Sequence, residues 1–470
     1  MKFYNTLTMK KEEFVPITPG KVGIYACGPT VYNYIHVGNA RPIIMFDVLR
    51  RYLEYRGFDV TFVQNFTDVD DKIINRAADE GISPEEVAEK YIAEYKTDAE
   101  NLGVLPATVH PKATESIGDI ILIIETLLSR GFAYERDGDV YFRTGSFENY
   151  GKFSRQPLDE LRAGARVETT DIKENPMDFA LWKAAKEGEP YWDSPWGKGR
   201  PGWHIECSAM SRRYLGETVD IHCGGQDLMF PHHENEIAQS EAASGKPFVN
   251  YWLHNGFISI DDKKMSKSLG NFFTVREAAE HYGYPSLRMF MLMSHYRSPL
   301  NYSGEILGQA AAALERLDTA KKNMEFYAAN GEARYLTEQE AEFAAKLGDY
   351  RERFIGEMDD DFNTADAVSV IFDMARDVNT RVAPQENPAA QLAAACLEVF
   401  MELSNVLGIP FSSAQDEIDS EIQAKIDARA AARLAKNWAE ADRIRDELAA
   451  MGITLEDTPQ GVKITVKEDK

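Results

Sequence analysis

The stretch from Val22 to Leu53 decides the fold of this chain; it begins Val-Gly-Ile-Tyr-Ala-Cys-Gly-Pro-Thr-Val-Tyr-Asn-Tyr-Ile-His-Val-Gly-Asn-Ala-Arg-Pro. Gly23–Ala26 is short, apolar and aromatic, which is typical of a buried parallel strand, and the Gly-Pro pair that follows ends regular structure. From Pro42 onward apolar residues recur at helical spacing, with Pro42 in the first turn, where a missing N–H costs nothing. Asp59–Gln64 is predicted to be the next strand. The pattern indicates a strand–loop–helix–strand unit of a parallel sheet.

The segment His36-Val37-Gly38-Asn39 is predicted to lie in the loop at the entrance of this helix. In parallel sheets ligands bind beyond the carboxyl ends of the strands, and helix N-termini attract phosphate groups. A phosphate-binding site is therefore expected here. On this local signal alone, however, a glycine-containing connection whose histidine only packs is more frequent, because so short a motif often arises by accident.

Length and composition set bounds on the protein. At 470 residues the chain exceeds what one hydrophobic core can hold, so several domains are expected. The longest apolar stretch, Ile117–Leu128, is interrupted by acidic residues and is too short to span a bilayer, and the first residues contain no apolar signal core. We expect a cytoplasmic protein with no membrane partner. The four cysteines are widely spaced, which argues against a disulfide framework.

Patterning along the chain predicts an α/β fold in three parts. Residues 1–303 are expected to form a Rossmann-like parallel-sheet domain with an insertion at about 112–200, which includes a hairpin over Ala133–Arg143. Residues 304–407 are almost wholly helical in pattern and predict a bundle. Residues 408–470 begin with a polar linker and continue as two short helices and a hairpin, a small mixed α/β domain.

A second chemical feature is the segment Lys264-Met265-Ser266-Lys267-Ser268, which is followed by Gly270. Two ammonium groups and two hydroxyls on such a loop can close over a triphosphate and stabilise the charge that develops at phosphorus. Taken alone, a lysine-rich loop of this kind is far more often a solvated charged turn.

Together the two features resemble the paired signature of the class I aminoacyl-tRNA synthetases, and within that class the chain is similar to the cysteinyl-tRNA synthetases from Phe3 to its end. One departure is Asn39, where the class signature usually has histidine; this family is similar to the chain in accepting asparagine, and an amide can still donate to a phosphate oxygen. The stretches that carry the resemblance are Tyr25–Tyr32, Thr67–Lys72, Asn175–Phe179, Gly202–Ser208 and Phe230–Glu236.

The resemblance implies a site for ATP, with Mg²⁺ on the pyrophosphate. His36 and Asn39 would hold the phosphates from one side and Lys264 and Lys267 from the other, as the expected catalytic residues. Asp227 is expected to contact the adenosine or the amino group of the substrate. The other expected ATP-binding residues are Thr30, Gly38, Ser266 and Ser268.

Cysteine and histidine positions point to a metal. Cys27 and Cys207 alone would more often be small buried residues, but two thiolates with an imidazole and a carboxylate make a four-ligand zinc set. Spacing does not choose between His232 and His233, because Glu236 lies four residues from one and three from the other. The resemblance implies one zinc ion on Cys27, Cys207, His232 and Glu236.

Zinc would solve a selectivity problem, because cysteine and serine differ only by sulfur against oxygen and shape alone discriminates them poorly. Borderline-soft Zn²⁺ binds a thiolate well and a hydroxyl poorly, so direct coordination would select cysteine without an editing site. Cys223 matches no ligand of the family and is expected to pack. By resemblance, the substrate pocket includes Cys27, Thr67, Trp203 and His232.

RNA binding has to use local basic patches, because the net charge of −24 opposes nonspecific binding to nucleic acid. Lys425, Arg429, Arg433 and Lys436 follow helical spacing and predict a basic stripe, although a merely solvated face has the same pattern. Asn437 is predicted to cap a second helix, with Trp438 exposed in its first turn, where it can stack on an unpaired base. The family's anticodon-binding domain has its Trp at the matching position. The expected tRNA contacts are Arg429, Arg433, Lys436 and Trp438.

The resemblance implies a monomeric enzyme that forms cysteinyl-adenylate from L-cysteine and ATP and passes the acyl group to the 3′ end of cysteine tRNA, with residues 256–303 as a region that contacts the tRNA stem. A related ligase that joins cysteine to an amino sugar is one rival, but such relatives lack the RNA-binding module that Phe411–Lys470 supplies. A noncatalytic RNA-binding paralogue is opposed by the intact lysine segment and zinc candidates. A structural zinc module would leave the phosphate loops unexplained.

Overall fold

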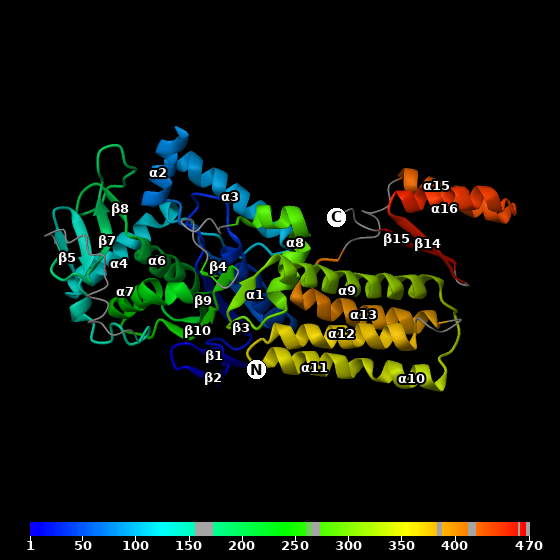
Figure 1. Ribbon diagram of the computed structural model, residues 1–470. Helices are drawn as coiled ribbons and strands as arrows, with labels where there is room; N and C mark the ends of the chain where they lie inside the picture. The colour runs from blue at the N-terminus through cyan, green and yellow to red at the C-terminus, as the bar shows by residue number, and fades with distance from the viewer. Residues whose placement is uncertain are drawn as a thin grey trace. The chain divides into compact units, whose positions relative to one another are not determined.

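The computed structural model describes residues 1–155, 173–260, 263–264, 273–382, 388–411, 420–458 and 461–466. The chain forms two compact units (Figure 1). The first comprises Met1–Ala278, Ser294–Ser303 and Met358–Asn363, and the second comprises Ala279–Met293, Gly304–Glu357 and Thr364–Lys470. Gly304, the predicted start of the helical bundle, is one of the points at which the chain passes from the first unit to the second.

A four-stranded parallel sheet lies at the centre of the first unit, as the α/β fold class predicts. Its strands are β3 (Lys21–Ala26), β4 (Asp59–Gln64), β9 (Val219–Gly225) and β10 (Val249–Asn255), in the order β10-β9-β3-β4. The predicted strands β3 and β4 are confirmed. The fourth, β10, is missing from the prediction because Asn250, His254 and Asn255 interrupt its apolar pattern; His254 and Asn255 are nevertheless buried.

Helix α1 begins earlier than the sequence predicts. It spans Val37–Tyr55 with His36 as its N-cap, so Pro42 lies inside the helix and not in its first turn. Gly38 and Asn39 are therefore in the first turn of the helix instead of in a preceding loop. The other helices of this region are α2 (Asp71–Glu80), α3 (Pro84–Asn101), α4 (Ile117–Ser129), α6 (Trp203–Leu215) and α7 (Glu234–Ser244).

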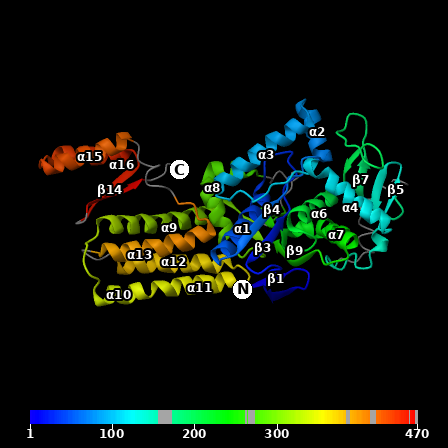
Figure 2. The ribbon, with the colours of Figure 1, turned by 180° about the vertical axis from the view of Figure 1, so that it is seen from behind.

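The insertion contains an antiparallel sheet in the order β5-β6-β7-β8, and β5 and β7 lie close to α4 in both views (Figures 1 and 2). The predicted hairpin turn is confirmed: Asp137 and Gly138, with φ of 53° and 86°, connect the first two strands, as a tight turn with two left-handed residues requires. Trp182 and Phe142 are fully buried in the core that this sheet shares with α4. The strands are β5 (Ala133–Arg136), β6 (Asp139–Phe142), β7 (Phe179–Ala184) and β8 (Gly199–Pro201).

Two smaller sheets complete the strands of the first unit. In one, β11 (Ile258–Ile260) pairs antiparallel with β12 (Lys263–Lys264) and parallel with β13 (Leu300–Tyr302). Lys264 is thus paired through its backbone with Ser259. The other is the hairpin of β1 (Lys2–Asn5) and β2 (Lys10–Glu13).

The second unit is helical, with one hairpin near its end. Helix α13 is long and apolar enough to cross a membrane by length and composition alone, but half of it is buried, and it lies beside α9 and α12 in both views, as a core helix of a bundle does (Figures 1 and 2). Its helices are α8 (Val275–Leu292, which starts in the first unit and is kinked at Gly283), α9 (Gly304–Asn330), α10 (Glu338–Ala345), α11 (Leu347–Asp359), α12 (Thr364–Arg381) and α13 (Ala390–Leu407).

The C-terminal elements form the predicted small α/β module. Helices α15 (Ser420–Leu434) and α16 (Trp438–Ala450) pack with the antiparallel hairpin of β14 (Ile453–Thr458) and β15 (Gly461–Val466). Their shared core includes Ile426, Ile444, Leu448, Ile453 and Leu455.

Candidate active site

A cavity of about 490 Å³ lies at the carboxyl ends of β3, β9 and β10 and at the start of α1. Its size suits a small-molecule site, and its position is where parallel sheets bind ligands. The sequence-predicted residues that the structure brings together in its wall are Cys27, Thr30, His36, Gly38, Asn39, Trp203 and Asp227.

Gly28 sets the shape of the wall where β3 ends. Its N–H donates to Asn65 Oδ1 at 2.9 Å, and a Cβ at this position would lie 1.6 Å from the carbonyl oxygen of Asn65. Glycine is therefore required for the two strand ends to approach so closely. The backbone beyond this point stays paired with the segment after β4, because Val31 N–H donates to Thr67 O at 3.2 Å.

The segment His36–Asn39, which is predicted to bind phosphate, lies in the cavity wall at the start of α1. Asn39 Oδ1 accepts a hydrogen bond from the N–H of His36 at 3.2 Å, so the side chain caps its own helix. This leaves the Nδ2 group as a donor, which suits a phosphate oxygen and accounts for asparagine in place of histidine.

The chain just after the lysine segment is hydrogen-bonded to the residues around the start of α1. The N–H of Val37 donates to Phe273 O at 3.2 Å, and the N–H of Val275 donates to Ile35 O at 3.0 Å. The chain that follows the lysine segment is thereby held against the start of α1. Ser266, Lys267 and Ser268 lie outside the described residues, and of Lys264 the backbone alone is described.

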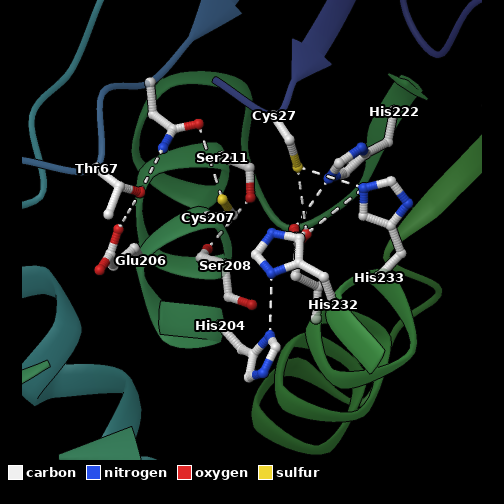
Figure 3. Close-up of polar contacts among 12 residues, drawn as sticks. Cys27, Thr67, His204, Glu206, Cys207, Ser208, Ser211, His222, His232 and His233 are labelled. Atoms are coloured by element: carbon white, nitrogen blue, oxygen red, sulfur yellow. Dashed lines mark hydrogen bonds and ion pairs between the residues drawn. The ribbon is translucent and has the colours of Figure 1, made fainter. Parts of the chain in front are cut away.

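Four potential metal ligands converge beside the cavity (Figure 3). Cys27 follows β3, Cys207 lies on α6, His232 precedes α7 and Glu236 lies in its first turn. One donor atom from each lies within 4.8 Å of all the others, and His232 Nε2 is 3.0 Å from Glu236 Oε1. Three of the four side chains are buried, and Cys27 is half-buried on the cavity side. The set is the one that the family resemblance implies.

A second set satisfies the same distance criterion: Cys27, His222, His233 and Glu236. The structure thus brings both adjacent histidines to the cluster, as the ambiguous spacing allowed. His222 Nε2 lies 2.9 Å from Glu236 Oε2, and His233 Nε2 lies 3.3 Å from Cys27 Sγ. The first set contains two thiols and the second one, and thiolates are the ligands that zinc favours most in closed sites.

Further partners orient both histidines. His233 Nδ1 lies 2.8 Å from His254 Nε2, and the other nitrogen of His254 lies 2.8 Å from Thr6 Oγ1. His232 Nδ1 lies 3.0 Å from His204 Nδ1, and its ring stacks on Trp203 with centroids 4.3 Å apart. Such outer contacts fix the ring orientation that a metal ligand needs.

The electrostatics favour the charged forms of Cys207, His232 and Glu236, whereas burial and the neighbouring Cys207 raise the pKa of the Cys27 thiol well above its ordinary value. A hydrogen bond from Cys27 lowers the pKa of Cys207 to about 6. Burial acts to lower the pKa of His232, but Glu236 and Cys207 together raise it to about 10. Burial acts to raise the pKa of Glu236, yet His222 and His232 lower it to about 2. A buried thiolate and carboxylate need positive charge close to them, and a divalent metal ion fits this cluster by donor type and distance.

Two expected pocket residues behave differently from each other. Trp203 is 39% exposed and lines the cavity beside His232. Thr67 is buried and its hydroxyl donates to Glu206 Oε2 at 2.7 Å, so it supports the wall without appearing among the described residues that line the cavity. The contact of Thr67 with the substrate stays a prediction, and the structure adds that its hydroxyl is bonded to Glu206.

Cys223 packs as expected. It is buried, its thiol donates to Tyr25 O at 3.5 Å, and burial raises the pKa of that thiol well above its ordinary value.

Sequence reasoning assigned no role to three cavity residues, Tyr32, Lys72 and Asn255. Lys72 Nζ lies 5.4 Å from the centre of the Tyr32 ring, a cation–π contact at the cavity wall. Tyr32 and Lys72 fall in two of the stretches that carry the family resemblance, so the sequence marks both residues but does not indicate what they do.

In the C-terminal module, only some of the residues predicted to contact tRNA are exposed to solvent. Trp438 is 58% exposed at the start of α16, Asn437 caps that helix through a 3.4 Å bond from Glu440 N–H, and the Arg433 guanidinium lies 6.0 Å from the Trp438 ring. Arg429, however, is buried, and Lys436 lies beyond the end of α15 with φ of 54°. The predicted basic stripe is therefore interrupted at the buried Arg429, whereas Lys436 is exposed just beyond the helix and its contact with tRNA stays a prediction.

Comparison with known protein families covers most of the chain. Residues 13–312 match the model of the "tRNA synthetases class I (C) catalytic domain", residues 353–412 match the "DALR domain", and residues 415–464 match the "Cysteinyl-tRNA ligase anticodon binding domain". The third match falls on the module that the amino-sugar ligase rival lacks.

Individual relatives and solved structures agree with these matches. The chain is 60% identical to a cysteine–tRNA ligase of Clostridioides difficile (strain 630), covering 98% of this chain and 99% of that one, and 55% identical to one of Brevibacillus brevis, covering 98% of each. In fold it is similar to Mycobacterium tuberculosis methionyl-tRNA synthetase in complex with methionyl-adenylate, with a TM-score of 0.60 at 17% identity over 82% of this chain and 89% of that one. The chain therefore belongs to the cysteinyl-tRNA synthetase family of class I aminoacyl-tRNA synthetases.

Proposed function

We propose that the cavity is where L-cysteine and ATP react, and that one zinc ion on Cys27, Cys207, His232 and Glu236 selects the thiol of the substrate. As a member of its family the chain is an ATP-dependent cysteine–tRNA ligase. It forms cysteinyl-adenylate and pyrophosphate, and then transfers the cysteinyl group to the 3′ end of cysteine tRNA. The observation that carries the proposal is the four-donor cluster, which adjoins the wall that bears His36 and Asn39.

Bound zinc would supply a borderline-soft Lewis acid that accepts a substrate thiolate and rejects a hydroxyl. Cys27 belongs both to the cluster and to the cavity wall, so a thiol in the cavity can approach the metal on that side. Trp203 stacks on His232 and closes the same wall. His222 engages Glu236 Oε2, which directs Oε1 of the same carboxylate toward His232 and Cys27.

For adenylate formation we propose that Asn39 Nδ2 and His36 hold the phosphates of ATP and that Lys264 and Lys267 neutralise them from the other side, with Mg²⁺ on the pyrophosphate. The reaction calls for positioning and charge stabilisation rather than a side-chain nucleophile. Asp227 lines the cavity and is proposed to hold the adenosine or the amino group of cysteine. Thr30, Gly38, Ser266 and Ser268 complete the proposed ATP contacts.

For tRNA binding we propose that Trp438 stacks on an anticodon base and that Arg433 contacts the RNA backbone near it. The exposure of Trp438 and its proximity to Arg433 support this role. The burial of Arg429 removes it from the proposed contacts.

A matched pair of variants tests the zinc assignment, because Cys207 belongs only to the first donor set and His233 only to the second. Cys207→Ser is expected to lower zinc content and cysteine-dependent ATP–pyrophosphate exchange, whereas His233→Gln keeps one zinc per chain. Metal analysis and exchange are measured on protein purified without chelator. Full zinc content in Cys207→Ser together with its loss in His233→Gln would transfer the assignment to the second set.

A further inference from the structure

Arg41 is a buried cation on α1, two residues beyond Asn39, and its side chain is fully shielded from solvent. Its Nη1 donates to the carbonyl oxygens of Gly256 at 3.0 Å and Phe257 at 3.1 Å. Its Nη2 donates to those of His295 at 3.1 Å and Ser298 at 2.6 Å. Within the described part of the chain the partners of this guanidinium are main-chain carbonyls rather than a carboxylate. Burial lowers the pKa of Arg41 to about 10, so the group remains protonated near neutral pH.

The four carbonyls belong to two segments at the base of the small three-stranded sheet. Gly256 and Phe257 connect β10 to β11, and His295 to Ser298 precede β13. β11 pairs with both β12 and β13. The segment that leads into β11 and the segment that leads into β13 therefore both bond to the guanidinium. Lys264 lies on β12 of the same sheet.

The two segments approach each other very closely at this point. A Cβ on Gly256 would lie 2.5 Å from Ser298 O, the N–H of Gly256 donates to Tyr296 O at 2.8 Å, and the N–H of Leu300 donates to Phe257 O at 2.9 Å. Carbonyl oxygens that converge on one point repel each other unless donors lie between them. The planar fork of an arginine supplies several N–H groups in a fixed geometry, which a lysine cannot reproduce.

We propose that Arg41 is a positioning residue for adenylate formation: it sets the place of the β11–β12 strand pair relative to the start of α1. The helix carries His36 and Asn39 at one end, and the strand pair carries Lys264. The guanidinium therefore connects the helix that positions one set of phosphate-binding residues to the sheet that positions the other. The inference rests on the proposed role of Lys264 in binding phosphate. It assigns Arg41 an effect on the reaction without contact with ATP.

The proposal predicts a selective kinetic defect. A displacement of about 1 Å at a reacting group can cost about 100-fold in rate, so Arg41→Gln is expected to slow adenylate formation by a factor on the order of 10². The KM for cysteine should stay close to that of the parent, because the hydrogen bonds of Arg41 within the described chain go to main-chain carbonyls and to none of the four proposed zinc ligands. Transfer of cysteine from preformed adenylate to tRNA should also stay near normal, since pyrophosphate has already left.

The experiment compares Arg41→Gln and Arg41→Lys with Arg50→Gln as the matched control. Arg50 lies on the same helix, but its guanidinium bonds to Glu54 Oε1 at 2.9 Å and Pro106 O at 2.7 Å, away from the strand pair. Single-turnover pyrophosphate exchange, the KM for cysteine and the transfer step are measured for each, with circular dichroism to verify the fold. Arg41→Lys should lie between the parent and Arg41→Gln, because an ammonium keeps the charge and part of the hydrogen bonding.

Two results would overturn the inference: exchange at the parent rate in Arg41→Gln, or an equal loss in exchange, cysteine binding and transfer, which marks a general structural defect. If Arg41→Gln fails to fold, the same criteria apply to Arg41→Lys. Lys264→Ala separates this inference from the role on which it rests. A slow Lys264→Ala with a normal Arg41→Gln rejects the positioning role alone, whereas a normal rate in Lys264→Ala rejects the phosphate role itself.

Discussion

The two ends of the cavity are built in different ways. At the metal end, four side chains from three stretches of the chain meet, and at least two of the donors, His232 and Glu236, have a further side-chain partner behind them. At the phosphate end, main-chain groups hold the parts together: residues just after the lysine segment bond to Ile35 and Val37, and Arg41 bonds to carbonyls. Substitutions at the metal end should therefore appear as lost binding, and substitutions at the phosphate end as lost rate.

The largest expected effect is that of metal removal. Chelation of the zinc should abolish cysteine-dependent ATP–pyrophosphate exchange, because the substrate thiol then has no metal ion to bind. The fold should survive, since the His222–Glu236 and His233–His254 contacts hold the start of α7 to β9 and β10 without a metal. Exchange and thermal unfolding are measured before and after dialysis against chelator, and readdition of Zn²⁺ should restore exchange. Full exchange in metal-free protein would show that the metal end does not select the substrate.

The next effect tests the phosphate end. Lys267→Ala should slow adenylate formation by roughly 10²–10³, because its charge would matter most in the transition state. Cysteine binding should remain nearly intact, which separates this variant from any change at the cluster. Single-turnover pyrophosphate exchange provides the rate, and an unchanged rate would leave Lys267 without a catalytic role.

A smaller effect on zinc affinity is expected from a residue that bonds to a proposed zinc ligand but not to the metal itself. His222→Gln removes the imidazole that holds Glu236 Oε2 at 2.9 Å, and loss of such an outer contact typically costs roughly 10–100-fold in metal affinity or activity. Competition with a calibrated chelator measures the zinc affinity. Unchanged affinity would mean that the carboxylate is oriented by other groups.

The smallest effect lies outside the cavity. Trp438→Ala should weaken tRNA binding by about 1–3 kcal/mol, the usual worth of one stacked base, and spare pyrophosphate exchange. The tRNA dependence of aminoacylation is measured beside exchange without tRNA. A joint loss of both activities with a lower melting temperature would instead make Trp438 a residue that supports the fold.

The sequence predicts the unit around β3, α1 and β4 well, because strand composition, helical spacing and punctuation by Gly and Pro are local signals. It places the start of α1 too late, since Pro42 is tolerated inside the helix and the cap is a histidine, which is not a standard capping residue. Strand β10 is missed because its polar residues have buried partners that sequence does not reveal, such as Thr6 for His254.

For the site, the sequence and the family resemblance predict which residues meet in the cavity, but not the orientation of each side chain. Thr67 faces Glu206, and Arg429 is buried close to Ile426 in sequence on the packed face of α15, so a helical spacing of basic residues did not ensure exposure. The outer contacts of His222 and His254 depend on distances between separate elements, which no local pattern encodes.

The central claim is that the substrate thiol binds the metal directly, and replacement of zinc by Co²⁺ tests it most directly. Cobalt–thiolate bonds absorb in the near ultraviolet, so each additional thiolate ligand adds intensity there. With the cobalt-loaded enzyme, saturating L-cysteine is predicted to increase this absorption and L-serine to leave it unchanged, and Cys207→Ser should lower the starting intensity. No change with cysteine, at concentrations that saturate pyrophosphate exchange, would contradict the claim.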